Sequence, residues 1–253
     1  MRKFKHPSQA GFSLIEFLIV ILVMSILMGA VFQQISLVQK RSSTEQNKLD
    51  MFQEAREFLD QMQRDLHAAG YPNQRNFGYS SSTPTNLYLT GANDMHNAVG
   101  LVKIASGELW FEGDTEGTGI VQSVRYYLDS TGNNCPCVKR AQIAKQNGDP
   151  VTGQGTAVFQ TEVQNVQNMN TSGTIVTPVF AAFDASGNAI TLPIDFDNNP
   201  ETLAAVRTIR MRIIVQAKNP DLQTGLSPIA TLNSMVSMNN CSAAAQSQSF
   251  SCQ

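Results

Sequence analysis

Residues 11–32 read GFSLIEFLIVILVMSILMGAVF, and this stretch decides how the chain is organised. From Phe12 to Phe32 it holds 21 residues and a single charge, Glu16. As a helix that rises about 1.5 Å per residue, it is about 30 Å long, which matches the hydrocarbon thickness of a bilayer. Three Lys or Arg residues and no acid precede it. The positive-inside rule therefore predicts that residues 1–11 stay in the cytoplasm and that the chain after Phe32 is exported.

A carboxylate inside this apolar run distinguishes it from simpler membrane segments. A cleaved secretory signal has a core of about 7–15 apolar residues and a small-residue cleavage site, and this stretch has neither. No cysteine precedes Cys135, which excludes a lipoprotein anchor. A plain single-pass anchor leaves Glu16 unexplained, because a charge in lipid costs about 3 kcal/mol. Cleavage between Gly11 and Phe12 would give Phe12 a free amine that Glu16 of a neighbouring subunit could neutralise.

A basic leader that ends in Gly11, then Phe12, then Glu16 and an apolar helix resembles the prepilin signature of type IV pilins and type II secretion pseudopilins. The resemblance implies cleavage after Gly11 by a membrane prepilin peptidase. It also implies N-methylation of Phe12 by the same kind of enzyme, and assembly into a helical filament through Glu16. Methylation keeps the charge of the amine, so the proposed pairing with a carboxylate is unaffected.

The helix is expected to run well beyond the membrane segment. No proline lies between Pro7 and Pro72, and Gly70 followed by Tyr71 and Pro72 is a helix stop. An apolar stripe steps by three or four residues through Leu49, Phe52, Ala55, Leu59, Met62, Leu66 and Ala69. The opposite face carries Lys48, Asp50, Glu54, Glu57, Asp60, Arg64 and Asp65. We expect one helix over residues 12–70, membrane-spanning at 12–32 and amphipathic at 33–70, with residues 42–44 the place for a break.

The remaining sequence, residues 71–253, predicts an exported β-rich domain. Strand-like stretches occur at 87–90, 99–104, 108–112, 120–128, 137–143, 157–166, 174–183, 189–194 and 206–217. Residues 105–107 indicate a hairpin. In 206–217 apolar residues mostly alternate with arginines, as in a half-buried antiparallel strand. The predicted fold class is α+β: a lollipop in which a long N-terminal membrane-spanning helix packs on a C-terminal antiparallel β-sheet domain.

Three further stretches resemble PilW-type minor pilins and the related J-type pseudopilins: residues 63–71, 124–129 leading into 138–140, and 162–167. The resemblance implies a minor pilin that helps to initiate or cap a pilus for twitching, adhesion or DNA uptake. Its implied partners are the prepilin peptidase, other minor pilins and the major pilin. The implied location is the bacterial inner membrane, with a periplasmic C-terminus, and then the pilus near its tip. A minor pseudopilin of type II secretion is the alternative, and a membrane-anchored periplasmic enzyme or binding protein is a third reading.

Four cysteines, Cys135, Cys137, Cys241 and Cys252, all follow the membrane segment, which suits an oxidising compartment. Four cysteines allow three pairings, and the sequence does not choose among them. A Cys241–Cys252 bond would close a C-terminal loop of the kind that pilins carry, and it leaves Cys135 and Cys137 to each other. Crossed pairing of the two sets is an alternative, and a metal or redox role for Cys135-Pro136-Cys137 is another.

No catalytic motif is visible, and neither a cofactor nor a metal is expected. Residues 195–201 hold enough oxygen-bearing side chains to suggest a calcium loop, although a solvated turn is the preferred reading. Loss of three basic residues with the leader leaves 15 basic against 20 acidic residues, a formal charge of −5, which does not indicate a nucleic-acid binder. Arg207, Arg210 and Arg212, with Lys218, could form a basic ribbon for an acidic partner or DNA, although an outward sheet face is the preferred reading.

Overall fold

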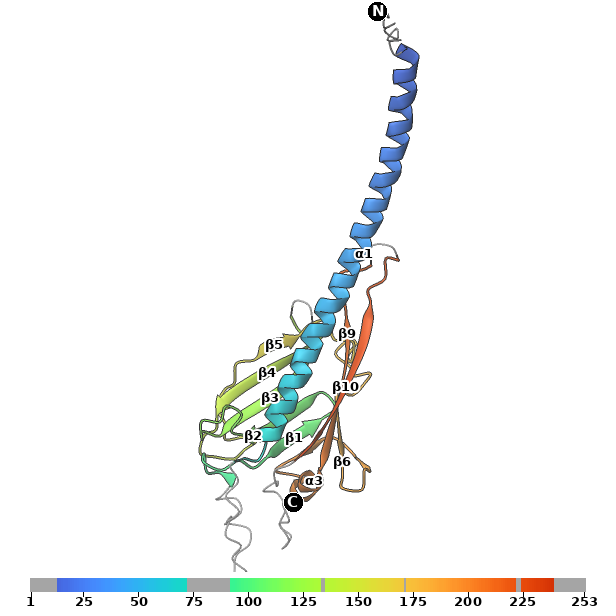
Figure 1. Ribbon diagram of the computed structural model, residues 1–253. Helices are drawn as coiled ribbons and strands as arrows, with labels where there is room; N and C mark the ends of the chain where they lie inside the picture. Colours follow the sequence, from blue (N-terminus) through green and yellow to red (C-terminus); the bar gives the residue numbers. More distant parts are fainter. Residues whose placement is uncertain (1–12, 72–91, 133–134, 171, 222–223, 239–253) are drawn as a thin grey trace, which may run out of the picture.

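The computed structural model describes residues 13–71, 92–132, 135–170, 172–221 and 224–238. A single long helix leaves a β-rich domain at one end, and only its second half lies against that domain (Figure 1). This arrangement confirms the predicted α+β class. In chain order the elements are α1 (Leu14–Ala68), β1 (Leu101–Ala105), β2 (Glu108–Gly113), β3 (Gln122–Asp129), β4 (Cys137–Ala144), β5 (Gln160–Val163), β6 (Phe180–Phe183), β7 (Ala189–Ile190), β8 (Ile194–Asp195), α3 (Pro200–Ala205), β9 (Thr208–Gln216) and β10 (Ile229–Ser237).

Helix α1 is continuous over 55 residues, which is about 80 Å of helix. The predicted break at residues 42–44 is wrong. The hydroxyl of Thr44 donates to the carbonyl of Lys40 at 3.1 Å and to the carboxylate of Asp221 at 3.3 Å, so this polar side chain is satisfied within the helix and by the domain. The predicted stop is confirmed: Gly70 adopts a φ of 78°, and its N–H donates to the carbonyl of Glu112 at 2.8 Å.

The strands form two sheets. Sheet A has the order β5-β4-β3-β2-β1-β8, and sheet B has the order β10-β9-β6-β7. All the pairs between these strands are antiparallel. The expected hairpin is present, because Ala105 pairs with Glu108 across Ser106 and Gly107. Helix α1 contacts β2 and β5 of sheet A and β9 and β10 of sheet B, so it closes the space between the sheets.

Several elements differ from those predicted. Strand β10 and helix α3 were not predicted, and the expected strands at 174–183 and 189–194 are reduced to the short strands β6, β7 and β8. Strand β10 reads IATLNSMVS, in which the inward positions hold small or polar residues as well as apolar ones, so its alternation is weak. The expected strand at 87–90 lies outside the described residues. The other predicted strands correspond to β1 to β5 and β9.

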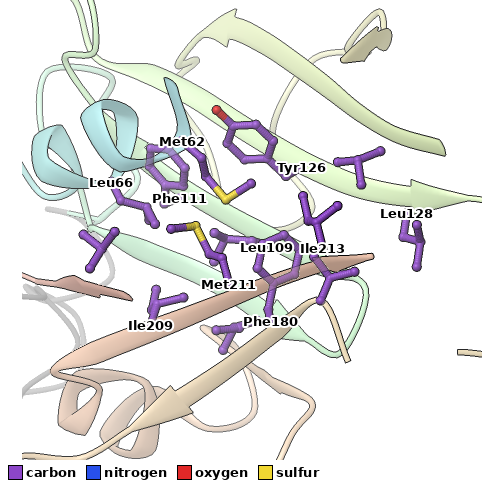
Figure 2. Close-up of a cluster of buried hydrophobic side chains, with 14 of the residues drawn as sticks. Met62, Leu66, Leu109, Phe111, Tyr126, Leu128, Phe180, Ile209, Met211 and Ile213 are labelled. Carbon is purple, nitrogen blue, oxygen red and sulfur yellow. The ribbon is translucent and has the colours of Figure 1, made fainter. Parts of the chain in front are cut away.

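The hydrophobic core lies where α1 meets both sheets (Figure 2). Each element contributes side chains that are at most 1% exposed: Met62 and Leu66 from α1, Leu109, Phe111, Tyr126 and Leu128 from sheet A, and Phe180, Ile209, Met211 and Ile213 from sheet B. Burial of each large apolar side chain stabilises the fold by about 1.5–3 kcal/mol. The second half of α1 is therefore an integral part of the domain.

The predicted apolar stripe is confirmed at Ala55, Leu59, Met62, Leu66 and Ala69, which are buried, but not at its first two positions. Leu49 is 67% exposed and Phe52 is 48% exposed, whereas Asp65, expected on the polar face, is 2% exposed. The buried positions Met51, Ala55, Phe58 and Met62 step by three or four residues, and the next step reaches Asp65. The helical period alone would have placed Asp65 in the core, whereas the charge of aspartate predicted a position on the solvent side.

Candidate assembly site on the N-terminal helix

The first half of α1 presents apolar side chains on every side. All residues from Ser13 to Ser36 are exposed, and the large apolar side chains among them range from 46% exposure at Ile35 to 80% at Leu14. The mean hydropathy of this part reaches 2.8, and its length and composition suffice to cross a membrane. A contiguous apolar surface of this extent requires lipid or other protein around it. This segment is therefore the main candidate for an assembly surface.

Glu16 lies in the first turn of α1, where it takes part in a capping box. Its carboxylate accepts the N–H of Ser13 at 3.3 Å, and the hydroxyl of Ser13 accepts the N–H of Ile15 at 3.4 Å. These bonds satisfy backbone donors that have no partner within the helix, and the negative charge suits the positive end of the helix dipole. Because Glu16 is exposed, its carboxylate is also accessible to a positively charged group of another molecule. Gly11 and Phe12 lie outside the described residues, so cleavage and methylation there remain predictions.

A buried polar cluster joins the second half of α1 to sheet A. The carboxylate of Asp65 accepts the hydroxyl of Tyr126 at 2.6 Å, the guanidinium of Arg140 at 2.8 Å, and the side-chain amide of Gln61 at 2.7 Å. Burial, together with the charge of Asp65, raises the pKa of the Tyr126 phenol, so Tyr126 stays a neutral donor. Burial opposes the charge of Arg140, but the negative charge of Asp65 and the hydrogen bonds to Asp65 and Tyr126 outweigh it and raise the pKa of Arg140. This cluster therefore ties the second half of α1 to β3 and β4 of sheet A.

A second buried ion pair secures the segment before β1. Lys145 and Glu112 are both 0% exposed, and their charged atoms lie 2.7 Å apart. The ammonium of Lys145 also donates to the carbonyls of Ala92 and Asn97 at 2.7 Å. Burial raises the pKa of the Glu112 carboxyl against the opposing effect of Lys145. Because both groups are sealed from solvent, we assign them a structural role.

The outer face of sheet A carries a stack of aromatic rings around one cation. The guanidinium of Arg125 lies 5.2 Å from the ring centre of Trp110, 5.9 Å from that of Tyr127 and 5.6 Å from that of Phe159. Glu108 contacts the same guanidinium and also binds Lys103 at 2.7 Å. These contacts attach the segment around Phe159 to the outer face of the sheet.

Cys135 and Cys137 form a disulfide bond, which excludes the crossed pairing. While this bond is intact, neither thiol of Cys135-Pro136-Cys137 is free to bind a metal. Cys241 and Cys252 lie outside the described residues, so their bond remains a prediction. The bridge stands at the start of β4, opposite Asp129 at the end of β3.

The segment suggested as a calcium loop forms a turn followed by α3. The carboxylate of Asp195 accepts the backbone N–H and the side-chain amide of Asn198, each at 2.8 Å. Pro200 and Glu201 then begin α3. Within the residues that the structure describes, no group of three or more His, Cys, Asp or Glu side chains is arranged to hold a metal ion.

The predicted basic ribbon is divided between different surroundings. Arg210 and Arg212 are exposed on the outer face of β9. Arg207 donates to the carbonyl of Ala204 at the end of α3. Lys218 lines a separate cleft beside α1. Only the two arginines of β9 therefore belong to one surface.

Comparison with known proteins identifies one feature. Residues 6–32 match the family model of the prokaryotic N-terminal methylation motif. No curated protein and no solved structure matches the chain. The motif supports a type IV pilin-like protein, either a pilin or a pseudopilin, that is processed by a prepilin peptidase and assembles with other pilins. It also suggests a structural subunit rather than an enzyme, and it is consistent with membrane anchoring.

Proposed function

We propose that the chain is a minor pilin, similar to PilW-type minor pilins, that co-assembles with other minor pilins and the major pilin to initiate or cap a type IV pilus. The observation that carries this proposal is the exposed apolar half of α1, which begins within the methylation motif. Before assembly this half would span the inner membrane, with the domain in the periplasm. After assembly it would pack among the helices of neighbouring subunits, near the tip of the pilus.

The chemistry of the N-terminus suits this transfer from lipid to filament. Cleavage after Gly11 would leave a methylated, positively charged amine on Phe12, about one turn from Glu16. In a bundle of parallel helices, Glu16 of one subunit can approach the amine of the next, and low dielectric surroundings strengthen the attraction between them. The capping box already holds the carboxylate at the helix N-terminus, where it would meet that amine.

The size of the domain and the form of the helix favour a minor pilin over a major pilin of the pilus shaft. Removal of residues 1–11 leaves 242 residues, most of them in the domain, which is longer than that of a typical major pilin. The helix also lacks the kinking proline that many pilins carry in the later part of the membrane segment, and α1 is continuous there. Both features fit a subunit present in few copies.

A minor pseudopilin of type II secretion is the second candidate, because the methylation motif and the exposed helix suit it equally well. Affinity purification from crosslinked cells separates the two. Recovery of other pilus subunits supports the pilin, and recovery of secretion-system components supports the pseudopilin.

The first test is the intact mass of the chain recovered from a bacterium that contains a prepilin peptidase. The expected mass is that of residues 12–253 plus one methyl group, less two hydrogen atoms for the Cys135–Cys137 bond and two more if Cys241 and Cys252 also pair. A full-length chain, or one cut near Ala30, would contradict the proposal.

The second test separates a filament subunit from an anchored enzyme or binding protein. The variant Glu16→Ala should lose incorporation into pili while it still reaches the membrane. The matched control is Glu45→Ala, which removes an exposed carboxylate of the same helix beyond the apolar half. Normal incorporation of Glu16→Ala would overturn the assembly role of this residue.

A further inference from the structure

The outer face of sheet B presents two arginines that lack an acidic partner among the described residues. Arg210 and Arg212 alternate along β9 with the buried residues Ile209, Met211 and Ile213. The guanidinium of Arg210 lies 5.3 Å from the ring centre of Phe183. Neither arginine forms an ion pair with any residue that the structure describes. Two like charges about 7 Å apart on one strand face repel each other, and an anionic group bound beside them would offset this repulsion.

The surroundings of these arginines resemble an interface more than a solvated sheet face. In the β9–β10 register, Arg210 is opposite Met235 and Arg212 is opposite Asn233. Met235 is 59% exposed, and Ile229 on the same face of β10 is 61% exposed. Arginine and methionine are enriched in protein interfaces, and a mixed apolar and cationic surface suits an amphipathic, acidic partner.

An acidic surface of that kind lies on α1. Asp50, Glu54 and Glu57 follow one another at intervals of four and three residues, so they share one face of the helix, and all three are exposed. With Glu162 of β5 they line an open groove of about 890 Å³. Repulsion between carboxylates one turn apart destabilises a helix by a few tenths of a kcal/mol, which a cationic partner would relieve.

The cations within this groove do not neutralise it. Arg140 is already paired with Asp65, and Arg64 donates to the side chain of Gln61. Glu54 accepts only a backbone N–H, from Gln164, among the contacts of the described chain. The groove therefore keeps an excess of negative charge, which Arg64 in its lining and Lys218 in the adjoining cleft offset only in part.

We infer that the outer face of β9 and β10 docks on the acidic face of α1 of a second copy of this chain. The rise between Glu54 and Glu57 is about 4.5 Å, and the two arginines lie about 7 Å apart, so neighbouring guanidinium groups can reach successive carboxylates with their forked donors. This charge complementarity is what selects a second copy as the occupant, because the chain carries both halves of the contact.

The two surfaces lie on opposite sides of the molecule. In Figure 1, β4 and β5 lie on one side of α1, and β9 and β10 lie on the other. A contact between unlike surfaces of two copies is heterologous, and it repeats around or along an axis instead of closing a two-fold dimer. The inference goes beyond the proposed function, since it places at least two copies side by side in the assembly.

Disulfide trapping in the full-length chain tests the contact in cells. A chain with Glu54→Cys and a differently tagged chain with Arg212→Cys should form a mixed disulfide on a non-reducing gel. Neither variant should do so when it is expressed alone. Arg56→Cys is the control for the first partner, because Arg56 is exposed two residues after Glu54, on the opposite side of α1, and should not crosslink to Arg212→Cys. Crosslinks only to other proteins, or equal crosslinking of the control, would overturn the inference.

Charge reversal provides a second test that is insensitive to simple misfolding. When both tagged copies carry Glu54→Lys with Glu57→Lys, recovery of one copy with the other should fall by about tenfold, as expected for close charge pairs. Addition of Arg210→Glu with Arg212→Glu to both copies should restore recovery. Failure of the reversed pair to restore it would refute the contact. The intact mass of the processed chain is measured on the same material, so a failure of the proposed function is distinguishable from a failure of this contact.

Discussion

Replacement of Asp65 by alanine is expected to loosen the attachment of α1 to the domain. The carboxylate of Asp65 is 2% exposed and accepts hydrogen bonds from Tyr126, Arg140 and Gln61. Without it, the charge of Arg140 and the hydroxyl of Tyr126 lose their buried acceptor. Removal of one partner from a buried ion pair costs about 3–5 kcal/mol.

The structure favours the lower end of that range. The side chain of Arg140 is 18% exposed, so water can replace a part of the lost interaction. We therefore expect Asp65→Ala to lower the free energy of unfolding by about 3 kcal/mol. For a domain of this size, that corresponds to a fall in Tm of about 6–12 °C.

Thermal unfolding of the purified full-length chain in detergent, followed by near-UV circular dichroism, measures this shift. Asp60→Ala is the control, since it removes an exposed acid of the same helix and should change stability by less than about 0.5 kcal/mol.

A triple variant completes the test. Asp65→Leu with Arg140→Met and Tyr126→Phe replaces three groups of the cluster, including both charges, by apolar groups, and it should recover most of the lost stability because no buried charge is left unpaired. Equal stability of Asp65→Ala and Asp60→Ala, or no recovery in the triple variant, would refute the reasoning.

Three further predictions concern the domain. Gly113→Ala should destabilise the domain by about 1–3 kcal/mol, because the new Cβ would lie 2.2 Å from a backbone carbonyl oxygen at the end of α1. Gly107→Ala should cost less, because the nearest atom there is the tip of a flexible side chain. Thermal unfolding that ranks the two variants in the reverse order would contradict this. Cys135→Ser with Cys137→Ser should lower stability by only about 1–2 kcal/mol, since the bond spans a sequence separation of 2; urea unfolding measures it, and a loss above about 4 kcal/mol would contradict it. Burial raises the pKa of Asp129, but hydrogen bonds from a lysine and a threonine outweigh this effect and leave that pKa below its ordinary value. The stabilisation by the Asp129 carboxylate is therefore complete at neutral pH and is lost as the pH falls below about 4. Asp129→Asn should show a shallower loss of Tm between pH 7 and pH 3, and parallel curves for variant and wild type would contradict this.

The sequence predicted the features that depend on neighbouring residues. A run of 21 residues with one charge specifies a membrane-length helix without reference to the rest of the chain, and the helix end at Gly70 and the β1–β2 hairpin follow from local signals in the same way. The methylation motif is also local, because it consists of a short leader, a cleavage site and the apolar run that follows. The match to its family model accordingly covers only residues 6–32.

Other features depend on contacts between distant segments. Strand β10 has a weak pattern of its own and exists through its pairing with β9. The division of the strands into two sheets also requires knowledge of which strands meet. The same holds for the two docking surfaces of the further inference, since Glu162 joins the acidic face of α1 only in the folded domain.

By itself, therefore, the sequence determined a long N-terminal helix that is apolar on all sides in its first half, a domain of antiparallel strands, and the residues of the methylation motif. Only the tertiary structure decided that Asp65 is buried, since its partners Tyr126 and Arg140 lie 61 and 75 residues away in the chain. Local patterns record the average environment of a residue type, which for aspartate is solvent. Asp65 is an exception because donors from distant parts of the chain compensate its buried charge, and only the tertiary structure shows which donors reach it.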